Sequence, residues 1–401
     1  MMNMVMVEQA QGLQTPRETY LHYDFSLLPR YLESLLPKLR IAVIYGGDSK
    51  KEGSVIHKTH NPRAWKSYEI VARDIQQALQ EVGFQNVFLM PDDMNLAQNL
   101  KEQRIHLAWL NTGGVQGYNP LCHTPGTLEM LGIPYIGHNP LNVSILDNKP
   151  TFKRELQALG IKTAPFITWH PSQGLLKPHT NSRFIEVFGD YQGPFVVKPA
   201  SGRASLHVHV VDSIDELRWV AAEVHRLTHN TVLIEAYLPG REYCVSVCGP
   251  VTCTKGRFTK NASPFAFSVL ERVLDEDELI FTSMDQRAIT SDRTRLIGEN
   301  NAELKQNLLD LAQKLYWEFS LRSLIRVDIR ADADGVLHVL EANPKPDLKK
   351  PTETVTSLAS IGLAEHGMSY NDLILALLAD RLDYLFTYST GTIQHIVDLL
   401  T

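Results

Sequence analysis

The sequence predicts a mixed α/β protein in which a parallel α/β domain is followed by two further domains. Between residues 39 and 140, short apolar strands alternate with amphipathic helices, a pattern typical of a parallel sheet. Beyond residue 141 the pattern changes, and it includes a strong hairpin signal at residues 323–343. A chain of 401 residues, 44% of them hydrophobic, is long enough for two to three such domains.

An extension of residues 1–38 precedes the first domain, and a short helical pattern near 32–36 suggests that it packs on the body. Residues 40–47 (RIAVIYGG) are typical of a buried strand that ends in a glycine turn. The elements expected after it are helix 63–82, strand 87–90, helix 95–103, strand 106–111, helix 124–131 and strand 134–136. We therefore expect the first domain to span residues 39–140.

The second domain is expected at residues 141–240 and the third at 241–401. In the second we expect helix 149–159, strand 166–169, strands 195–199 and 206–211 joined by a loop of small residues, helix 214–227 and strand 231–237. In the third we expect strands 243–247 and 267–273, helix 303–319, the hairpin at 323–343, and helices near 354–364 and 370–386.

Composition excludes several classes of partner. A net charge of −6 and a pI near 6.2 argue against nucleic acid or an anionic membrane. No apolar run reaches the length of a membrane helix, and the start MMNMVMVEQAQ does not look like a secretory signal. The four cysteines, Cys122, Cys244, Cys248 and Cys253, fit a reduced cytoplasmic chain, and we expect the last three to be buried in strands rather than to bind metal.

The hairpin carries the most informative polar residues. If Asp334-Gly335 forms a two-residue turn, Asp328 lies directly opposite Glu341, and Arg326 lies opposite Asn343. Two carboxylates directly opposed on paired strands repel each other, so this arrangement favours a bound cation. All three candidate ligands, Asp328, Glu341 and Asn343, offer oxygen, which suits Mg²⁺ rather than zinc. An exposed polar face with charges opposed by chance remains the alternative.

A second group of residues suits phosphate binding. The chain lacks the G-x-x-x-x-G-K-[ST] motif of P-loop proteins. Instead, Lys198 follows an apolar strand and precedes the small residues 201–205, whose backbone amides can approach an anion and whose Ser201 and Ser205 add hydroxyl groups. Lys149 begins a helix, and a solvated surface lysine is the alternative interpretation of that residue.

Residues 231–242 (TVLIEAYLPGRE) suit an adenine site. An apolar strand contains Glu235, Leu238 follows in the loop, and Glu242 comes shortly after. Glu235 and Glu242 could accept hydrogen bonds from the ribose or lie near the purine. A plain edge strand followed by a solvent-exposed turn would give the same pattern.

Taken together and in this order, six segments resemble the D-alanine–D-alanine ligase branch of the ATP-grasp superfamily. The segments are LEMLGIPYIGHNP (128–140), DNKPTFKRELQALGIKTAP (147–165), FVVKPASGRAS (195–205), VLIEAYLPGREY (232–243), IRVDIRADADGVLHVLEANPKP (325–346) and HGMSYNDLILAL (366–377). The resemblance covers roughly residues 39–390. It implies an N-terminal Rossmann-like domain followed by central and C-terminal ATP-grasp subdomains that clasp ATP between them.

The resemblance also implies a role for each candidate residue. Lys149 and Lys198 would contact the phosphates of ATP, and Ser205 would lie in the loop that closes over them. Glu235 and Leu238 would face adenine, with Glu242 near the ribose. The remaining residues implied are the Mg²⁺ ligands Asp328, Glu341 and Asn343, Arg326 at the tetrahedral intermediate, and Ser357 near the acceptor carboxylate.

The implied reaction joins a carboxylate to an amine. ATP converts the carboxylate into an acyl phosphate, two Mg²⁺ ions (or Mn²⁺) offset the phosphoryl charge, and Arg326 stabilises the oxyanion formed when the amine attacks. The substrates implied are small amino-acid-like molecules, and relatives of this kind suggest a homodimer. The expected location is the cytoplasm.

The segments that would choose the substrates depart from the family. The turn after the first strand is longer and basic (GGDSKKEGSVIHKTHNPRAWKSYE), and Asn343 is followed by PKPDLKKPTET, with Lys345, Lys349 and Lys350, where the family has P-G-M-T. The lysine–tyrosine pair of the family's lid has no clear match. Lys345, Lys349 and Lys350 suggest a more acidic acceptor substrate, although a solvated loop explains these lysines as well.

Three functions fit these features. The first is a ligase for amino-acid-like substrates other than two D-alanines. The second is a D-alanine–D-alanine ligase with a remodelled pocket, and the third is an ATP-binding module that regulates without catalysing. We favour the first, because Arg326 and the metal ligands are those of a catalyst while the substrate segments differ.

Overall fold

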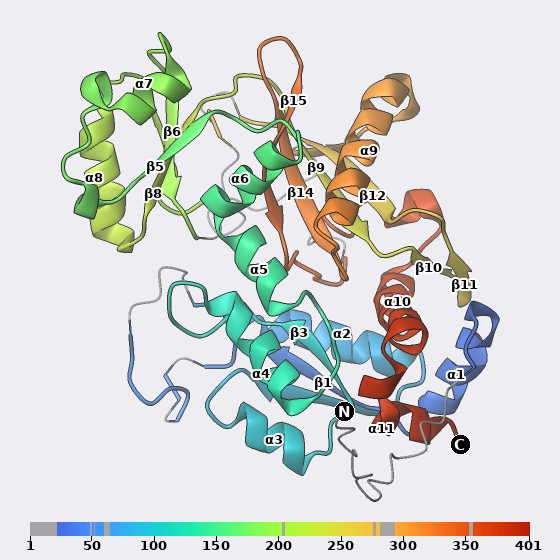
Figure 1. The fold of residues 1–401 in the computed structure, drawn as a ribbon. Helices are drawn as coiled ribbons and strands as arrows, with labels where there is room; N and C mark the ends of the chain where they lie inside the picture. The colour runs from blue at the N-terminus through green and yellow to red at the C-terminus, as the bar shows by residue number, and fades with distance from the viewer. Residues whose placement is uncertain are drawn as a thin grey trace, which may run out of the picture.

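Three larger β-sheets, a two-stranded sheet and the helices around them form the body of the protein in the described residues (Figure 1). The computed structural model describes residues 22–48, 50–51, 53–59, 65–202, 205–275, 278–280, 293–352 and 356–401. Each sheet falls within one of the three predicted domain ranges, 39–140, 141–240 and 241–401. The exact boundaries of those domains stay a prediction.

The N-terminal sheet is parallel, with strand order β2-β1-β3-β4. Its strands and helices are β1 (Arg40–Tyr45), α2 (Glu69–Glu81), β2 (Asn86–Pro91), α3 (Leu96–Glu102), β3 (Leu107–Asn111), α4 (His123–Leu131) and β4 (Tyr135–Ile136). Alternate residues of β1 are buried on opposite faces: Ile41 and Val43 pack with α2, whereas Ala42 and Ile44 pack with α3 and α4. A parallel sheet buried on both faces explains the nearly continuous apolar run in β1.

The first described helix and the long C-terminal helix pack together against this domain (Figure 1). Helix α1 (Leu28–Leu35) and the C-terminal helix α10 (Tyr370–Tyr388) share one core with α2. Tyr23 donates a hydrogen bond from its hydroxyl to Asp383 Oδ1 at 2.8 Å, and its ring packs against Phe386. Residues 22–38 therefore do pack on the body, as their helical pattern suggests, while residues 1–21 lie outside the described part of the chain.

The central sheet is antiparallel, with strand order β5-β8-β6-β7. Its elements are α5 (Pro140–Asp147), α6 (Lys149–Ala158), β5 (Phe166–Trp169), α7 (Ser182–Phe188), β6 (Phe195–Pro199), β7 (His209–Val211), α8 (Leu217–Thr228) and β8 (Val232–Ala236). One face packs on α7 and α8, with Phe184, Phe195 and Val224 in its core. The opposite face presents Lys198 and Glu235 toward the third sheet.

The C-terminal sheet is also antiparallel, with strand order β13-β12-β9-β14-β15. Its strands are β9 (Glu242–Cys248), β12 (Phe265–Arg272), β13 (Thr294–Leu296), β14 (Ile325–Ala331) and β15 (Leu337–Asn343). The strands β10 (Val251–Thr254) and β11 (Arg257–Lys260) form a separate two-stranded sheet. The helices of this part of the chain are α9 (Ala302–Glu318), α10 and α11 (Gln394–Val397). Helices α6 and α9 cover one face, where Val327 and Ile329 are fully buried. Figure 1 shows this sheet beside the central one, above the N-terminal domain.

Short 3-10 helices complete the described elements. They are η1 (Phe25–Leu27), η2 (Pro120–Cys122), η3 (Pro171–Gln173), η4 (Pro178–Thr180), η5 (Glu299–Asn301), η6 (Leu363–His366), η7 (Thr390–Thr392) and η8 (Asp398–Leu400). Among all the described residues, no helix combines the length and apolar character that a membrane crossing needs. Cys244, Cys248 and Cys253 are buried in β9 and β10, as expected.

Several elements differ from the sequence-based expectation. Helix α2 begins at Glu69 rather than near residue 63, because Tyr68 adopts a left-handed conformation (φ 56°) that interrupts the helix. Helix α5 is not predicted, although the Asn139 side chain caps it by accepting from the backbone N–H of Asn142. The β10–β11 hairpin is also missed; its two-residue turn is Lys255-Gly256, with both residues at positive φ.

The helix expected near 354–364 is wrong for the described residues of that range. Residues 356–362 form turns, and only η6 follows. Gly362 packs directly on β12, where a Cβ would lie 2.6 Å from the Cα of Ser268, and its backbone N–H donates to Ser268 Oγ at 2.9 Å. Apolar spacing alone does not reveal such a close approach.

A buried histidine joins the N-terminal domain to the C-terminal sheet and makes stability depend on pH. His138 is fully buried, and its Nε2 lies 3.3 Å from the carbonyl oxygen of Leu324. Burial lowers the pKa of His138 from 6.5 to about 4. Below pH 6.5 the unfolded chain binds a proton that the folded chain does not, so stability is lost as the pH falls from 6.5 through 4.

Replacing His138 with glutamine is expected to remove this contribution to the pH dependence of stability. Between pH 6.5 and 4 the contribution amounts to about 3 kcal/mol of unfolding free energy. Asp380 acts in the opposite direction, because burial raises its pKa to about 7, so wild type and variant must be compared at each pH. The measurement is urea unfolding from pH 7.5 to 4.5. The exposed His57, changed to glutamine, is the control, and equal pH dependence of the His138 variant and wild type would contradict the assignment.

Candidate active site

A cavity of about 310 Å³ lies between the central and C-terminal sheets, and the N-terminal domain contributes to its wall. Ten of the eleven candidate residues line it: Lys149, Lys198, Ser205, Glu235, Leu238, Glu242, Arg326, Asp328, Glu341 and Asn343. They come from α6, β6, β8, β9, β14, β15 and the loops between them. Segments separated by almost two hundred residues thus meet in one cleft.

The strand register of the β14–β15 hairpin agrees with the prediction at the candidate site residues. Asp328 lies opposite Glu341, and Arg326 lies opposite Asn343. The turn differs, however: Ala331 pairs with Leu337, so the strands are joined by a longer loop that contains Gly335 (φ 79°). A β-bulge between Asp328 and Ile329 shifts the register by one residue. This shift restores the predicted pairing from Asp328 to Arg326.

Asp328 is held by two arginines. Arg326 donates from Nε and Nη2 to the two carboxylate oxygens at 2.8 and 3.0 Å, and Arg272 Nη2 lies 2.9 Å from Oδ1. Arg272 also donates from Nη1 to Glu242 Oε1 at 2.8 Å. Arg272 is not among the predicted residues, because its position at the end of β12 gives no local signal in the sequence. The pairing of β12 with β9 brings Arg272 to Glu242.

Glu341 faces the helix that begins at Lys149. The ammonium of Lys149 lies 3.2 Å from Glu341 Oε2. Burial alone would raise the pKa of Glu341, but the positive charges of Lys149, Lys198 and Arg326 lower it to about 2. Glu341 is therefore ionised throughout the physiological range, as a metal ligand must be.

The oxygen atoms at this end of the hairpin fit a hard divalent cation. Asp328, Glu341 and Asn343 present two carboxylates and an amide from neighbouring strands, and the carboxylates are balanced by guanidinium and ammonium groups. Asn343 Oδ1 accepts from the backbone N–H of Lys345 at 3.0 Å, which orients the amide. A site made only of oxygen donors favours Mg²⁺ or Mn²⁺ over softer metals.

Glu235 is the centre of a buried charge cluster. Its carboxylate forms ion pairs with Lys198 and with Lys153, the latter at 2.9 Å, and all three side chains are nearly inaccessible to solvent. Burial raises the pKa of Glu235, but the two ammonium groups outweigh this effect and lower it. Lys153 was not predicted, although it follows Lys149 by one helical turn and so lies on the same face of α6.

The small-residue loop is partly as expected. Ser205 lines the cavity with a positive φ of 50°. Ser201 does not offer its hydroxyl to the cleft, because it is buried and donates to Asp147 Oδ2 at 2.8 Å. Arg203 and Ala204 lie outside the described residues.

The part of the cleft around Glu242 contains a further arginine, Arg330. Arg330 donates from Nη2 to the Tyr237 hydroxyl and to the carbonyl oxygen of Leu279, each at 2.9 Å, and its Nη1 lies 3.4 Å from Glu242 Oε2. Glu242 is thus shared between Arg272 and Arg330. Leu238 lies beside this group in the cavity wall and is almost fully buried.

Ser357, like Ser201, does not line the cavity. Its side chain is fully buried, and its hydroxyl is hydrogen-bonded to that of Ser360 at 2.8 Å. The next residue, Leu358, lines the cavity instead. In this arrangement Ser357 shapes the wall rather than facing a substrate.

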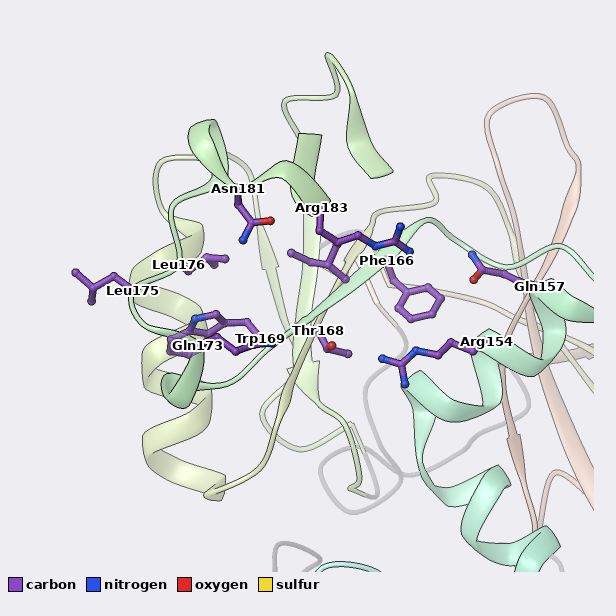
Figure 2. A pocket seen from close by; sticks show the side chains of 11 residues that line it. Arg154, Gln157, Phe166, Thr168, Trp169, Gln173, Leu175, Leu176, Asn181 and Arg183 are labelled. Carbon is purple, nitrogen blue, oxygen red and sulfur yellow. The ribbon is translucent and has the colours of Figure 1, made fainter. Parts of the chain in front are cut away.

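A second cavity, of about 270 Å³, shares no lining residue with the cleft (Figure 2). It lies beside the edge strand β5, and Figure 2 shows Arg154 and Arg183 on either side of Phe166. Arg154 is exposed, and Arg183 forms an exposed ion pair with Glu186 at 2.9 Å. Its charged groups are solvated and spread apart, so we assign no chemistry to it.

Known proteins match both the sequence and the fold. The family described as D-ala D-ala ligase C-terminus matches residues 156–379. The D-alanine–D-alanine ligase of Carboxydothermus hydrogenoformans is 26% identical over 306 residues, covering 76% of this chain and 90% of the relative. That of Aquifex aeolicus is 25% identical over 341 residues, covering 85% of this chain and all of the relative.

Solved structures show the same architecture. The crystal structure of a Bacillus anthracis D-alanine–D-alanine ligase complexed with ATP matches with a TM-score of 0.61 and 23% identity, covering 86% of this chain and 98% of that one. A second structure of that ligase matches with a TM-score of 0.58. The fold is therefore that of an ATP-grasp enzyme, which confirms the predicted fold class.

The chain belongs to the D-alanine–D-alanine ligase family, since the family match covers more than half of its residues. It is accordingly an ATP-grasp ligase that forms a carbon–nitrogen bond.

Proposed function

We propose that this ligase uses ATP to convert a carboxylate into an acyl phosphate and then joins it to an amine, on amino-acid-like substrates other than two D-alanines. The observation that carries the proposal is the strand register, which sets Asp328 opposite Glu341 and directs Arg326 into the same cleft as Lys149 and Lys198. Opposed carboxylates ringed by cations suit phosphoryl transfer through bound metal.

Two neighbouring groups of residues in the cleft would bind ATP. Lys149, Lys198 and Ser205 lie where they would contact the phosphates, and Ser205 belongs to the loop expected to close over them. Leu238 and Glu235 would face adenine, with Glu242 near the ribose. The lysines act as fixed positive charges, already positioned by Glu341 and Glu235.

Asp328, Glu341 and Asn343 would hold two Mg²⁺ ions, or Mn²⁺. Bound there, the metal would neutralise charge on the phosphoryl group during its transfer. The guanidinium of Arg326 is held in the cleft by Asp328. It would stabilise the oxyanion that forms at the acyl carbon.

The bond changes follow from this arrangement. A carboxylate oxygen of the first substrate attacks the γ-phosphorus, and ADP leaves. The amine of the second substrate then attacks the acyl carbon, Arg326 stabilises the tetrahedral oxyanion, and inorganic phosphate leaves with the oxygen that it gained. The amine loses one proton, and no covalent bond to the enzyme is needed.

A second candidate function is the ligation of two D-alanines. It is favoured by the names of the two curated relatives, both of which are D-alanine–D-alanine ligases matched over most of their length. The basic loop after Asn343 favours the first candidate instead, because it places lysines at the end of the cleft where the amine would bind. A homodimer and a cytoplasmic location remain predictions.

The test is ADP release from ATP and Mg²⁺ over a panel of paired amino acids and short peptides, with mass spectrometry of the products. We expect ADP release that depends on both substrates and yields a condensed product 18 mass units lighter than their sum, because one water equivalent is removed. Turnover of D-alanine alone at the highest rate of the panel would select the second candidate. Absence of ADP release from every pair would contradict both.

A further inference from the structure

Two arginines lie over one tyrosine ring where helix α10 meets the N-terminal domain. The guanidinium carbon of Arg322 is 3.8 Å from the centre of the Tyr384 ring, and that of Arg381 is 5.6 Å from the same centre. Arg381 also lies 5.6 Å from the centre of the Tyr135 ring, which belongs to β4. None of these four side chains lines the catalytic cleft. Two positive groups therefore share one place outside it.

The fold brings the two arginines together from separate segments. Arg381 and Tyr384 are three residues apart on α10, so they lie on the same face of that helix. Arg322 comes from the connection between α9 and β14. Tyr388, one further turn along α10, contacts Tyr384 with ring centres 5.2 Å apart. The Tyr384 ring is thus held against its own helix and keeps both guanidinium groups at one place, where both are partly exposed.

The charges of this arginine pair are not balanced by carboxylates. Among the residues that the structure describes, none has a carboxylate within 4 Å of the guanidinium nitrogens of Arg322 or Arg381, and none accepts a hydrogen bond from them. Burial lowers the pKa of Arg381, and the positive charge of Arg322 lowers it further. The two groups therefore lie close enough to repel each other, in a partly buried place where salt screens poorly.

Two nearby acidic residues are engaged elsewhere. The carboxylate of Asp380 faces the turn between β9 and β10, where its Oδ1 accepts from the backbone N–H of Val251 at 3.2 Å. Burial raises the pKa of Asp380 to about 7, so this group carries less than a full negative charge at neutral pH. Glu129 on α4 accepts from the Tyr135 hydroxyl at 2.7 Å. Neither carboxylate forms an ion pair with the arginines.

Two hydrogen-bond donors at this place are buried without an acceptor among the described residues. They are the Nε–H of Arg381 and the hydroxyl of Tyr316 on α9. Burial raises the pKa of Tyr316, and the charges of both Arg322 and Arg381 act on its hydroxyl in the opposite sense, so Tyr316 lies near the pair. A water molecule would satisfy the donors but leave the two positive charges unbalanced. An anion would do both.

From this geometry we infer that Arg322 and Arg381 bind a small oxyanion of the size and charge of phosphate, at a site separate from the catalytic cleft. A guanidinium group can donate two parallel hydrogen bonds to such an anion, and phosphate has enough acceptor oxygens for both arginines. The inference does not rest on the proposed function, although inorganic phosphate is a product of that reaction. A bound phosphate offsets the repulsion between the arginines and so stabilises the folded chain.

The first experiment measures the melting temperature of the full-length protein in sodium phosphate, sodium acetate and sodium chloride at equal ionic strength. A non-hydrolysable ATP analogue and Mg²⁺ are present in each sample to fill the catalytic cleft. We expect the melting temperature to be highest in phosphate, because only an anion that binds the folded chain stabilises it beyond charge screening. Equal melting temperatures in phosphate and chloride would overturn the inference, and so would a larger increase in acetate than in phosphate.

Arg322→Met and Arg381→Met are each expected to abolish most of the increase caused by phosphate. Arg218→Met is the matched control: it removes an arginine of α8 that also lies over an aromatic ring, 4.2 Å from the centre of Trp219, and it should keep the increase. Unfolding in chloride verifies that each variant is folded, and Arg381→Lys replaces Arg381→Met if that variant is not. An unchanged increase in both site variants would overturn the inference.

Calorimetric titration of phosphate into the same full-length protein measures binding directly. We expect a site whose affinity falls about tenfold or more in Arg322→Met and does not change in Arg218→Met. Phosphate that binds in the catalytic cleft would appear as a component that both variants leave unchanged. If the protein releases no ADP but shows the expected pattern, the ligase proposal fails and the anion site stands. If phosphate does not bind, or binds equally well to Arg322→Met, the anion site fails.

Discussion

Replacing Glu341 with glutamine is expected to lower the rate of ADP release by about 10²–10³-fold. Metal-bound phosphoryl groups gain several kcal/mol of charge stabilisation, and about 1.4 kcal/mol corresponds to a factor of ten in rate. Glutamine keeps the size and one oxygen of Glu341 but loses the charge that its low pKa guarantees at neutral pH. The measurement is steady-state ADP release as a function of Mg²⁺ concentration, and the concentration needed for half-maximal rate should rise.

The control is Asp334→Asn, which removes a carboxylate at the exposed tip of the same hairpin. It should leave both the rate and the Mg²⁺ dependence unchanged. Glu341 is a suitable target because its side chain is 35% exposed and pairs with Lys149 at the rim, so its loss should not unfold the protein. A rate within twofold of wild type would show that Glu341 does not hold catalytic metal.

Replacing Glu235 with glutamine is expected to lower the unfolding free energy by about 3–5 kcal/mol, because it leaves Lys153 and Lys198 as buried ammonium groups without their carboxylate. Lys153 is fully buried and Lys198 nearly so. Urea unfolding measures the loss. The variant should also bind ATP more weakly, since Lys198 loses the carboxylate that positions it.

Two comparisons separate this effect from ordinary loss of a charge. Adding Lys153→Met to the Glu235→Gln variant removes one of the uncompensated ammonium groups and should recover part of the stability. Glu69→Gln removes the same group from an exposed pair with Arg73 and should cost about 0.5 kcal/mol or less. If Glu235→Gln and Glu69→Gln cost the same, the buried cluster does not carry the stability assigned to it.

Most features of the β14–β15 hairpin could be predicted from the sequence, but its turn could not. Alternation along β14 predicts correctly that Val327 and Ile329 enter the core while Arg326 and Asp328 face the cleft. The register at Asp328 is also correct, but the turn on which it was based is not. The longer loop and the bulge shift the pairing in opposite directions, so the two errors cancel at Glu341.

Local sequence patterns do not predict the residues that reach the site only through tertiary packing. Arg272 reaches Asp328 only because β12 and β14 flank β9 in one sheet. Lys153 looks like any helical lysine until α6 is packed on the C-terminal sheet and its side chain meets Glu235. For Ser201 and Ser357 the prediction is wrong in the opposite sense. Both are expected at the cleft, but each hydroxyl is hydrogen-bonded to another side chain in the protein interior.

The loop after Asn343 could be predicted only in part. Its lysines are visible in the sequence, but only the structure separates Lys350, which turns to α2, from Lys345 and Lys349, which line the cavity. Spacing along an irregular loop does not determine side-chain direction as it does in a helix or strand.

The central claim is that ATP phosphorylates an oxygen atom of the carboxylate substrate in this cleft. The most direct measurement uses a carboxylate substrate carrying ¹⁸O at both oxygens and determines the isotope content of the released inorganic phosphate. An acyl phosphate transfers one of the two labelled oxygens to phosphate and leaves the other in the new amide. Phosphate with one ¹⁸O atom per molecule of product is the predicted result; unlabelled phosphate formed together with the amide would contradict the account.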